Sequence, residues 1–317
     1  MGQYVTPIIE SSRHPNQNHI YIKRDDLYPV ALGGNKARIA EAMIEDALKK
    51  GCSHIVSYGS VTSNMNRAVA VLCGSRHLRC TVICPQEENL AEKSGNSVIV
   101  QTCGAHIVRC TKDKVAETVE QVCQRIKENG EQPYYIYGNK YGKGNEVTTS
   151  KVYIDVYHEI LEQEKHMKMD FDYIFHATGT GMTQAGLIVG NCMNQKKHRI
   201  VGISIARDKD RELPVLVEKV KQFSEIMDGK SFDADDFILY DKAIGTGYGQ
   251  ADDSLNKTIR EELCLDGIPL DITYTGKAFM GMLRYIEERD IHNKNILFIH
   301  TGGTPLFFDN LQEIMQI

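Results

Sequence analysis

A lysine at the start of a helix is the residue of this sequence best placed for chemistry. Lys36 belongs to the stretch 32–38, Leu-Gly-Gly-Asn-Lys-Ala-Arg, and apolar residues recur at spacings of three and four after it. The glycines and Asn35 indicate a tight turn and a helix cap, which places Lys36 in the first helical turn. The positive end of a helix dipole disfavours an ammonium group there. A lowered pKa would expose the free amine that makes a Schiff base. The alternative is an ordinary solvated lysine.

Loops rich in glycine and hydroxyl groups lie between predicted strands and helices. The loop 178–183, Thr-Gly-Thr-Gly-Met-Thr, follows a strand and precedes a helix whose free amides can bind a phosphate. It is neither a P-loop nor a complete G-x-G-x-x-G, because Gln184 stands at the third glycine position. The loop 57–64 carries hydroxyls and an amide that suit a ring substituent or a carboxylate, and the loops 272–277 and 300–304 have similar compositions. Each loop alone is also compatible with an ordinary turn or helix cap.

The elements that must position these loops alternate along the chain. Strands are predicted at 20–24, 54–58, 79–84, 98–101, 106–109, 134–137, 173–177, 199–205, 237–240 and 295–300. Helices are predicted at 36–48, 63–74, 114–129, 151–164, 183–194, 213–227, 250–264 and 275–288, with another beginning at 89–94 and a short one in the tail. This alternation predicts an α/β fold with largely parallel sheets, in which ligands bind at the carboxyl ends of strands.

Composition narrows the class of protein. The chain has 37 Lys and Arg against 42 Asp and Glu, a net charge of −5, which argues against a nucleic-acid partner. No apolar run approaches the roughly 20 residues of a membrane span, and no signal peptide is visible. The length of 317 residues favours two domains. We therefore expect a cytosolic, cytoplasmic protein with no membrane partner.

The cysteines and histidines give no sign of a metal. The nine cysteines form no C-x-x-C pair and lie mostly in apolar segments such as 80–84, where a free thiol behaves as a small apolar side chain. The eleven histidines include no H-E-x-x-H motif. We expect reduced, buried cysteines and no metal site.

Taken together, the motifs resemble those of pyridoxal-phosphate enzymes of the tryptophan-synthase-β fold type. Within that group they are most similar to the D-cysteine desulfhydrase and 1-aminocyclopropane-1-carboxylate deaminase family. The matching motifs occur in the family's order: Lys23-Arg24-Asp25-Asp26, Gly33-Gly34-Asn35-Lys36-x-Arg38, Ser63-Asn64, Ala177-Thr178-Gly179-Thr180-Gly181, Tyr274-Thr275-Gly276-Lys277 and His300-Thr301-Gly302-Gly303. Gly-Gly-Asn-Lys is the most specific of them.

The resemblance implies pyridoxal 5'-phosphate as the cofactor. Lys36 would bind it covalently as a Schiff base, and Asn64 would hydrogen-bond its ring hydroxyl. Either Thr275 or Thr301 would lie near the pyridine nitrogen. Backbone amides would hold the phosphate, and they belong to Thr178, Gly179, Thr180, Gly181, Met182 and Thr183.

For the substrate, the resemblance implies a small amino acid. Ser63 would lie near its carboxylate and the transferred proton, and Tyr248 and Tyr274 would face it. The family's loop reads Gly-Ile-Gln-Ser-Asn-His, and Thr62 stands here in place of the Gln that helps to bind substrate. The ring-opening deaminases carry a Glu where this chain has Thr275, and the desulfhydrase branch lacks that acid. We therefore expect β-elimination to a keto acid and ammonia, a lyase reaction. Ring opening of 1-aminocyclopropane-1-carboxylate and β-replacement are the alternatives.

The resemblance also implies an architecture. Residues 1–40 and 150–317 would form a large domain and 41–149 a small one, with the cofactor in the cleft and the chain in a homodimer. Two other classes of protein stay open. An NAD(P)-dependent oxidoreductase would use the glycines of the loop 178–183 for the pyrophosphate and Arg207 for a 2′-phosphate. A non-catalytic pyridoxal-phosphate-binding protein would hold the cofactor without turnover.

Overall fold

The chain folds into two units. The computed structural model describes residues 4–86, 94–195, 198–223 and 231–315. One unit combines Met1–Tyr28 with Ser150–Ile317, and the other is Pro29–Thr149. Residues 29–40, which the sequence placed with the larger domain, group with the smaller unit, because the helix that carries Lys36 packs along a second helix of that unit.

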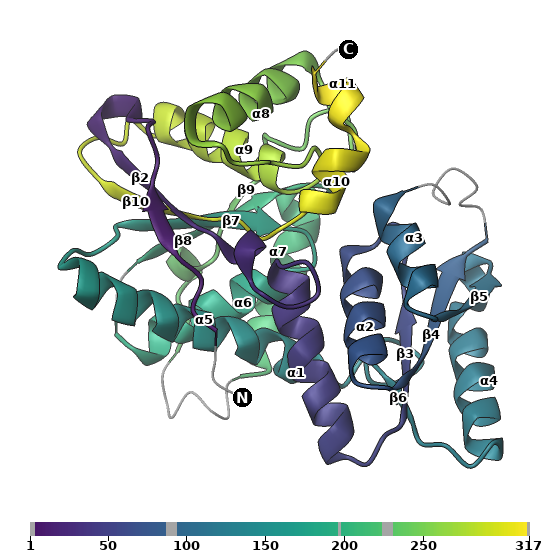
Figure 1. Cartoon of the computed structure of the whole chain (residues 1–317). Coiled ribbons are helices and arrows are strands. Elements are labelled where there is room, and N and C mark those ends of the chain that lie inside the picture. The colour runs from purple at the N-terminus through teal and green to yellow at the C-terminus, as the bar shows by residue number, and fades with distance from the viewer. Residues whose placement is uncertain (1–3, 87–93, 196–197, 224–230, 316–317) are drawn as a thin grey trace. The chain divides into compact units, whose positions relative to one another are not determined.

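The larger unit is built on a six-stranded sheet. In spatial order its strands are β1 (Ile8–Glu10), β2 (His19–Lys23), β10 (Asn295–Ile299), β7 (Tyr173–Thr178), β8 (Arg199–Ser204) and β9 (Ile238–Tyr240). Strand β1 is antiparallel to β2, and the other pairs are parallel. Strands β2 and β10 lie side by side although they come from opposite ends of the chain (Figure 1).

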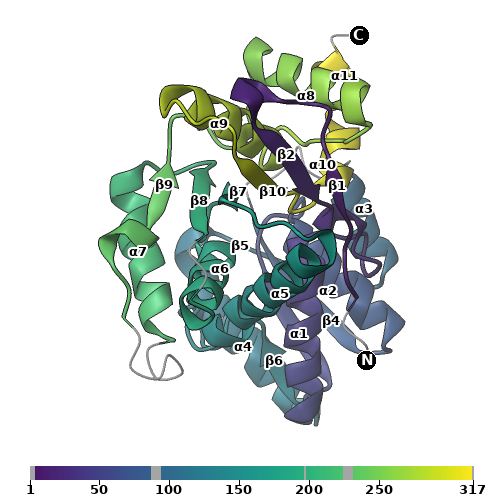
Figure 2. The ribbon, with the colours of Figure 1, turned by 90° about the vertical axis from the view of Figure 1, so that its left-hand side faces the viewer.

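Helices cover both faces of this sheet. They are α5 (Glu146–Met167), α6 (Met182–Met193), α7 (Lys209–Lys221), α8 (Asp253–Asp266), α9 (Thr275–Glu288), α10 (Thr304–Asp309) and α11 (Leu311–Met315). Helices α8 and α9 lie on one side of the sheet, and α5 and α6 lie on the other (Figures 1 and 2). Between sheet and helix, the rings of Phe279 and Phe298 meet edge to face at 5.1 Å in the buried core.

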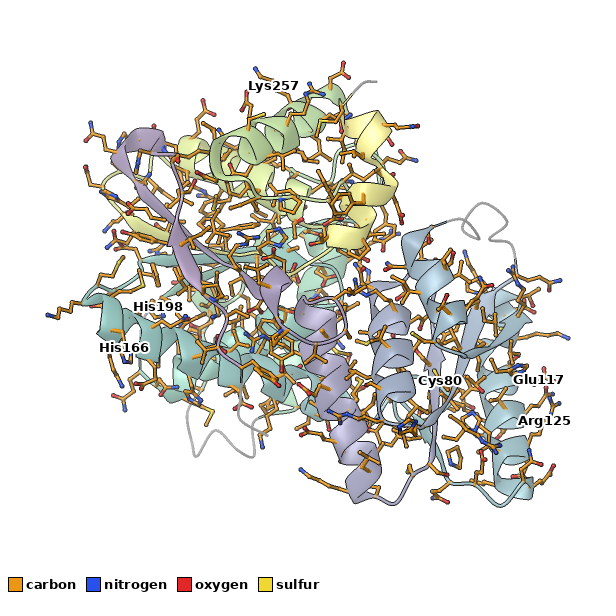
Figure 3. The ribbon with its side chains drawn as sticks, in the orientation of Figure 1. Cys80, Glu117, Arg125, His166, His198 and Lys257 are labelled. Atoms are coloured by element: carbon orange, nitrogen blue, oxygen red, sulfur yellow. The ribbon has the colours of Figure 1, made fainter. Side chains whose placement is uncertain are left out.

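The smaller unit holds a four-stranded parallel sheet. Its strands, in spatial order, are β5 (His106–Cys110), β4 (Arg79–Pro85), β3 (His54–Tyr58) and β6 (Pro133–Tyr135). Its helices are α1 (Asn35–Lys49), α2 (Asn64–Ser75), α3 (Gly95–Thr102) and α4 (Val115–Glu128). Helices α1 and α3 pack on α2, and α2 packs on the sheet. In α4, Glu117 and Arg125 point outward while Val119, Val122 and Ile126 are buried (Figure 3), so the amphipathic helix predicted at 114–129 is confirmed.

The predicted α/β fold with parallel sheets is confirmed, and one predicted strand is wrong. Residues 98–101, Val-Ile-Val-Gln, belong to helix α3. Ser94 caps that helix by accepting a hydrogen bond from the amide of Ser97 at 3.1 Å. Packing of Val100 in the core overrides the strand preference of β-branched residues. Most of the helix start predicted at 89–94 and part of the segment 213–236 lie outside the described residues.

Two further features bear on the expectations from composition. None of the helices in the described part of the chain is long and apolar enough to cross a membrane. The nine cysteines, all within the described part of the chain, form no disulfide; most are buried or half-buried, whereas Cys264 is exposed. Cys264 therefore departs from the expected pattern of buried thiols.

Candidate active site

Lys36 follows an unusual turn. Ala31, Leu32, Gly33 and Gly34 all have positive φ, from 46° to 87°. This left-handed run is costly for Ala and Leu and favourable for glycine. Helix α1 begins at Asn35, and its cap is Gly34 with no side-chain hydrogen bond. Asn35 is thus the first helical residue rather than the cap, and Lys36 lies in the first turn as predicted.

The side chain of Lys36 is half-buried, and its chemistry reflects this. Burial lowers the pKa of Lys36 from 10.5 to about 8. The direction agrees with the sequence prediction, but its largest cause is loss of water around the amine rather than the helix dipole. A lysine with such a pKa offers a sizeable fraction of free amine near neutral pH.

A buried arginine supports this turn. Arg67 of α2 donates through Nη2 to the carbonyl of Gly33 at 3.3 Å. Its Nε and Nη1 are buried without a partner among the described residues. Burial lowers the pKa of Arg67 to about 10, so the guanidinium stays charged at neutral pH. Arg67 links α2 to the turn before Lys36, a role that was not predicted from sequence.

The side chain of Asn66, in helix α2, holds the loop between β3 and α2 by hydrogen bonds. Its Nδ2 donates to the carbonyls of Gly59 at 3.1 Å and Ser60 at 2.8 Å, and its Oδ1 accepts from the Ser57 hydroxyl at 2.6 Å. Ser63 caps α2, since its Oγ accepts from two backbone amides of the first turn. An ordinary helix cap was the alternative role considered for this loop, and Ser63 fills it, whereas Asn66 was missed.

Asn64 is oriented by a second asparagine. Asn96 of α3 donates through Nδ2 to Asn64 Oδ1 at 2.9 Å and to the Thr62 carbonyl at 2.8 Å. The amide oxygen of Asn64 is therefore engaged, and its Nδ2 is the group that remains to donate. A donor in this position fits the hydroxyl oxygen on the ring of pyridoxal phosphate. The contact ties helix α3 to the loop that carries Asn64.

In the larger unit, the loop 178–183 has the geometry of an anion cradle. It connects β7 to α6, and the cap of α6 is Gly181, with φ of 72° and no side chain to occupy the first-turn amides. A Cβ at Gly179 would lie only 3.3 Å from Ile205 Cδ1. The hydroxyl of Thr178 is buried with no partner among the described residues. These features fit a phosphate bound by backbone amides.

An arginine considered for a 2′-phosphate has another partner. Arg207 Nη1 lies 3.0 Å from Oε2 of Glu212, a buried carboxylate of α7. A Cβ at Gly181 would lie 3.5 Å from the other oxygen of Glu212. Burial raises the pKa of Glu212. This pairing argues against a role for Arg207 in binding a 2′-phosphate.

The structure brings Tyr248 and Tyr274 together. Their hydroxyls hydrogen-bond each other, and their rings meet edge to face at 5.8 Å. Lys277 is buried and donates through Nζ to the carbonyls of Ile244, at 2.8 Å, and Gly247. Lys277 thus ties the loop that carries Tyr248 to α9. Lys277 belongs to the family motif at residues 274–277, but no role was predicted for it from sequence.

A buried carboxylate organises the loop of Tyr274. Asp271 accepts hydrogen bonds from the amides of Thr273, Tyr274 and Thr275 at 2.9 to 3.0 Å and from the Thr275 hydroxyl at 2.8 Å. A Cβ at Gly303, whose φ is 93°, would collide with the Asp271 carboxylate. Asp271 therefore holds its own loop by hydrogen bonds, and Gly303 lets the loop after β10 lie against the same carboxylate. Asp271 was missed from sequence.

The two threonines considered for the pyridine nitrogen have different surroundings. The Thr275 hydroxyl donates to Asp271 Oδ1 and accepts from the Asp271 amide at 2.9 Å. The Thr301 hydroxyl has no hydrogen-bond partner in the described part of the chain, although Thr301 is buried. Thr301 is the one whose hydroxyl is not already engaged.

The motif at residues 23–26 is structural. Lys23 Nζ lies 2.6 Å from Oε1 of Glu159, and both side chains are almost fully buried. Asp25 accepts from the Tyr153 hydroxyl at 2.8 Å, and Arg24 forms a two-point pair with Asp26. These contacts fasten the start of the chain to α5.

The predicted residues thus gather into two groups, one in each unit. In the larger unit, β7 and β10 are parallel neighbours, so the loops 178–183 and 301–303 leave the same edge of the sheet. The Asp271 carboxylate lies against Gly303 of the second loop and accepts a hydrogen bond from the amide of Tyr274. In the smaller unit, Ser63 and Asn64 share one loop, and Arg67 connects their helix to the turn of Lys36.

Comparisons with known proteins identify the class. A family described as "Pyridoxal-phosphate dependent enzyme" matches residues 1–302. A putative 1-aminocyclopropane-1-carboxylate deaminase of Pyrococcus abyssi is 31% identical, covering 94% of this chain and 88% of the relative. D-cysteine desulfhydrase of Yersinia pestis is 30% identical, covering 96% and 92%. A crystal structure described as an ACC deaminase homologue superimposes with a TM-score of 0.86 at 28% identity, covering 99% and 94%.

The chain is a pyridoxal-phosphate-dependent enzyme with the tryptophan-synthase-β-like fold. Within this class it belongs to the family of 1-aminocyclopropane-1-carboxylate deaminases and D-cysteine desulfhydrases. The cofactor and family expected from the motifs are confirmed.

Proposed function

We propose that this enzyme removes the Cα proton of a small amino acid and expels a substituent from its β carbon. The products are a 2-oxo acid, ammonia and the leaving group. With cysteine, for example, one water is consumed and pyruvate, ammonia and hydrogen sulfide are formed. The relatives carry the names of both an elimination enzyme and a ring-opening enzyme, so residues of this chain must decide between them.

The observation that favours elimination is the surroundings of Thr275. Its hydroxyl is neutral and already bonded to Asp271, and Asp271 itself accepts four hydrogen bonds. A carboxylate so fully engaged is poorly placed to protonate a ring nitrogen. Bound pyridoxal phosphate supplies an electron sink, and without a nearby acid that sink is weaker. A weaker sink suits a substrate whose leaving group departs soon after deprotonation.

Named residues would hold the cofactor. We propose that Lys36 binds it covalently and that Asn64, held by Asn96, donates to the hydroxyl oxygen on its ring. The amides of the loop 178–183 would bind its phosphate. For the ring nitrogen we propose Thr301, because the Thr275 hydroxyl is used within its own loop.

Proton transfer would fall to Lys36. Its pKa of about 8 provides a free amine to take the proton from Cα near neutral pH. Ser63 would contact the substrate carboxylate, and the hydrogen-bonded pair Tyr248 and Tyr274 would orient the substrate.

We further propose that the enzyme is a homodimer, which analytical ultracentrifugation would test.

Thr62, which replaces the Gln of the family's loop, bears on which leaving groups the enzyme accepts. The Thr62 hydroxyl lies 2.8 Å from the Ser60 hydroxyl, and its backbone carbonyl accepts from Asn96. The side chain is therefore engaged within its own loop and cannot reproduce the reach of a Gln. We expect substrates to be chosen less by a hydrogen bond at this position than by the size of the β substituent.

The test is a screen of amino acids with the holoenzyme. D-cysteine, L-cysteine, both enantiomers of β-chloroalanine and 1-aminocyclopropane-1-carboxylate would be compared by 2-oxo acid and ammonia release. Lys36→Ala is the inactive control. Turnover of a β-substituted amino acid, with pyruvate as product, supports elimination. Turnover of the cyclopropane substrate alone would show that ring opening is the function, and bound cofactor without any turnover would point to a binding protein.

A further inference from the structure

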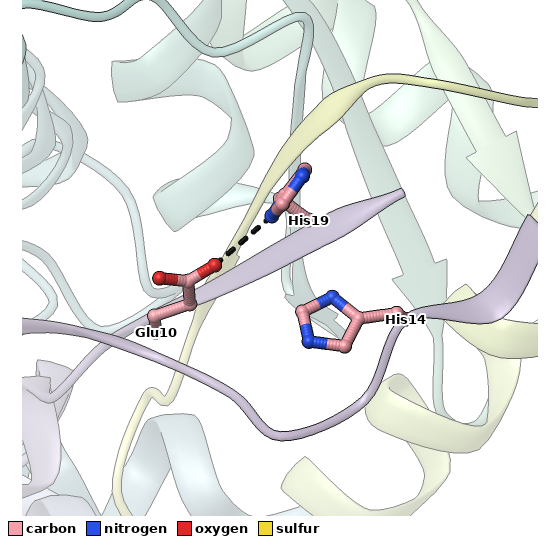
Figure 4. A group of neighbouring side chains, drawn as sticks. All are labelled: Glu10, His14 and His19. Carbon is pink, nitrogen blue, oxygen red and sulfur yellow. Dashed lines mark hydrogen bonds and ion pairs between the residues drawn. The ribbon is translucent and has the colours of Figure 1, made fainter. Parts of the chain in front are cut away.

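Three side chains of metal-ligand type meet on the surface of the larger unit. Glu10, His14 and His19 are exposed, and one ligand atom from each lies within 4.8 Å of the other two. Figure 4 shows the Glu10 carboxylate bonded to His19, with the ring of His14 turned toward both. The distance from Glu10 Oε1 to His19 Nδ1 is 3.0 Å. None of these residues takes part in the active-site contacts described above.

The hairpin of β1 and β2 places two of the three ligands. Glu10 ends β1 and His19 begins β2, and the register pairs Glu10 with Tyr21. Because side chains alternate along a strand, His19 and Tyr21 share one face of the sheet, and Glu10 is the diagonal neighbour of His19 on it. Regular strand pairing therefore brings carboxylate and imidazole together without any special loop.

The third ligand comes from the loop between these strands, and Asn18 fixes that loop. Asn18 is fully buried, and its Nδ2 donates to the carbonyls of Pro15 and Ile291, both at 2.8 Å. Its Oδ1 accepts from the amide of Lys294 at 2.8 Å. The loop is thus anchored to the start of β10. His14 stands directly before Pro15, and its ring centre lies 5.3 Å from that of His19.

We propose that Glu10, His14 and His19 form a site for a divalent transition-metal ion of the zinc class. Tetrahedral zinc with bonds of about 2.0–2.1 Å holds its ligand atoms about 3.3 Å apart. Glu10 and His19 are already near this spacing at 3.0 Å, and the His14 ligand atom, within 4.8 Å of both, would have to move closer as its side chain rotates. A set of two imidazoles and one carboxylate binds zinc and neighbouring transition-metal ions in preference to calcium or magnesium. Water would complete the coordination.

Binding would clamp the hairpin and its loop. The ion joins the end of β1, the loop and the start of β2, which together form the edge of the six-stranded sheet. A ligand that binds the folded chain and not the unfolded chain raises the melting temperature. The ion would therefore act on stability, and its effect does not depend on the proposed reaction.

The experiment uses the untagged holoenzyme without substrate. Equilibrium dialysis against zinc or cobalt(II) should give one bound ion per chain, and the melting temperature should rise by a few degrees. His14→Ala and His19→Ala should each weaken binding at least tenfold and abolish the shift. His292→Ala is the matched control, because His292 is also an exposed histidine paired with a carboxylate, Asp290.

Thiols could also bind these ions, and the design separates them. Cys264→Ser removes the exposed thiol and should leave binding unchanged. Cobalt(II) bound by nitrogen and oxygen should lack the intense near-ultraviolet band of thiolate ligation. If the wild-type chain binds no ion, Glu10 and His19 are an ordinary surface ion pair and the proposal is wrong. Full binding by the double variant His14→Ala/His19→Ala would also overturn it.

Discussion

The pKa of Lys36 makes a quantitative prediction about how the enzyme captures its cofactor. With a pKa of about 8, about half of the Lys36 side chains carry a free amine at pH 8. With the ordinary value of 10.5, only about 0.3% would do so. Since only the free amine attacks an aldehyde, burial should raise the rate of covalent capture by about 160-fold at this pH.

The sign of the pH dependence follows from the same shift. Below about pH 8 the rate should fall about tenfold for each unit of pH, and above it the rate should level off. The assay mixes cofactor-free enzyme with pyridoxal 5'-phosphate between about pH 6 and pH 11, traps the product with borohydride and counts labelled peptide. Capture by a free lysine derivative under the same conditions corrects for ionisation of the cofactor itself.

Two results would refute this reasoning. An inflection near the ordinary value of 10.5 would show that burial does not tune the amine. Label on a peptide without Lys36 would show that another lysine is the attachment site. Lys36→Arg is the control, because it keeps the positive charge and cannot lose its proton near neutral pH. That variant should bind the cofactor reversibly and give no label.

Three other changes separate the roles of the site and its supports. Gly179→Val should weaken cofactor retention more than tenfold because its Cβ would already lie 3.3 Å from Ile205 Cδ1 and the branched side chain would crowd the loop. Unchanged retention by dialysis would contradict this. Tyr274→Phe should lower kcat about 10- to 100-fold with little loss of cofactor, and a loss in cofactor binding alone would reverse the assignment. Lys23→Met should cost about 3 kcal/mol of unfolding free energy, because it leaves Glu159 buried without its cation. The control Lys50→Met, at an exposed ion pair, should cost less than about 1 kcal/mol. Equal losses in urea titrations would argue against a structural role for Lys23.

The sequence was most informative where local chemistry decides the structure. The loop 178–183 was recognisable because glycines and threonines stand between a buried strand and a helix. The first-turn position of Lys36 followed from the glycines before it. In both places the backbone conformation is set by residues that are adjacent in sequence.

The sequence was less informative where distant residues decide. The strand expected at 98–101 is a helix because Ser94 caps it, Val100 packs in the core and Asn96 hydrogen-bonds Asn64. The β-branched run Val-Ile-Val describes a preference that this tertiary contact overrides. Strand preference alone gave the wrong element because it takes no account of the partner helix α2.

The supporting side chains of the site were also hidden in the sequence. Asn66, Arg67 and Asp271 are not among the residues expected to contact cofactor or substrate. Each forms a hydrogen bond with the backbone of a loop that carries such a residue. Buried polar groups must be satisfied, so such residues are required wherever an irregular loop is held in place. Their identity depends on which backbone atoms the fold brings near, which no short motif records.

The group of Glu10, His14 and His19 was also hidden from sequence, because its residues are brought together by strand pairing. His14 and His19 are five positions apart and Glu10 precedes both, a spacing that matches no metal-binding motif. The sequence therefore predicted no metal, and β1, only three residues long, was not predicted at all. Once β1 pairs with β2, the register places Glu10 diagonally across from His19, and Asn18 holds the loop of His14 against the start of β10. The convergence is a property of the hairpin rather than of the spacing. It is also why His14→Ala or His19→Ala should remove metal binding without disturbing the strands.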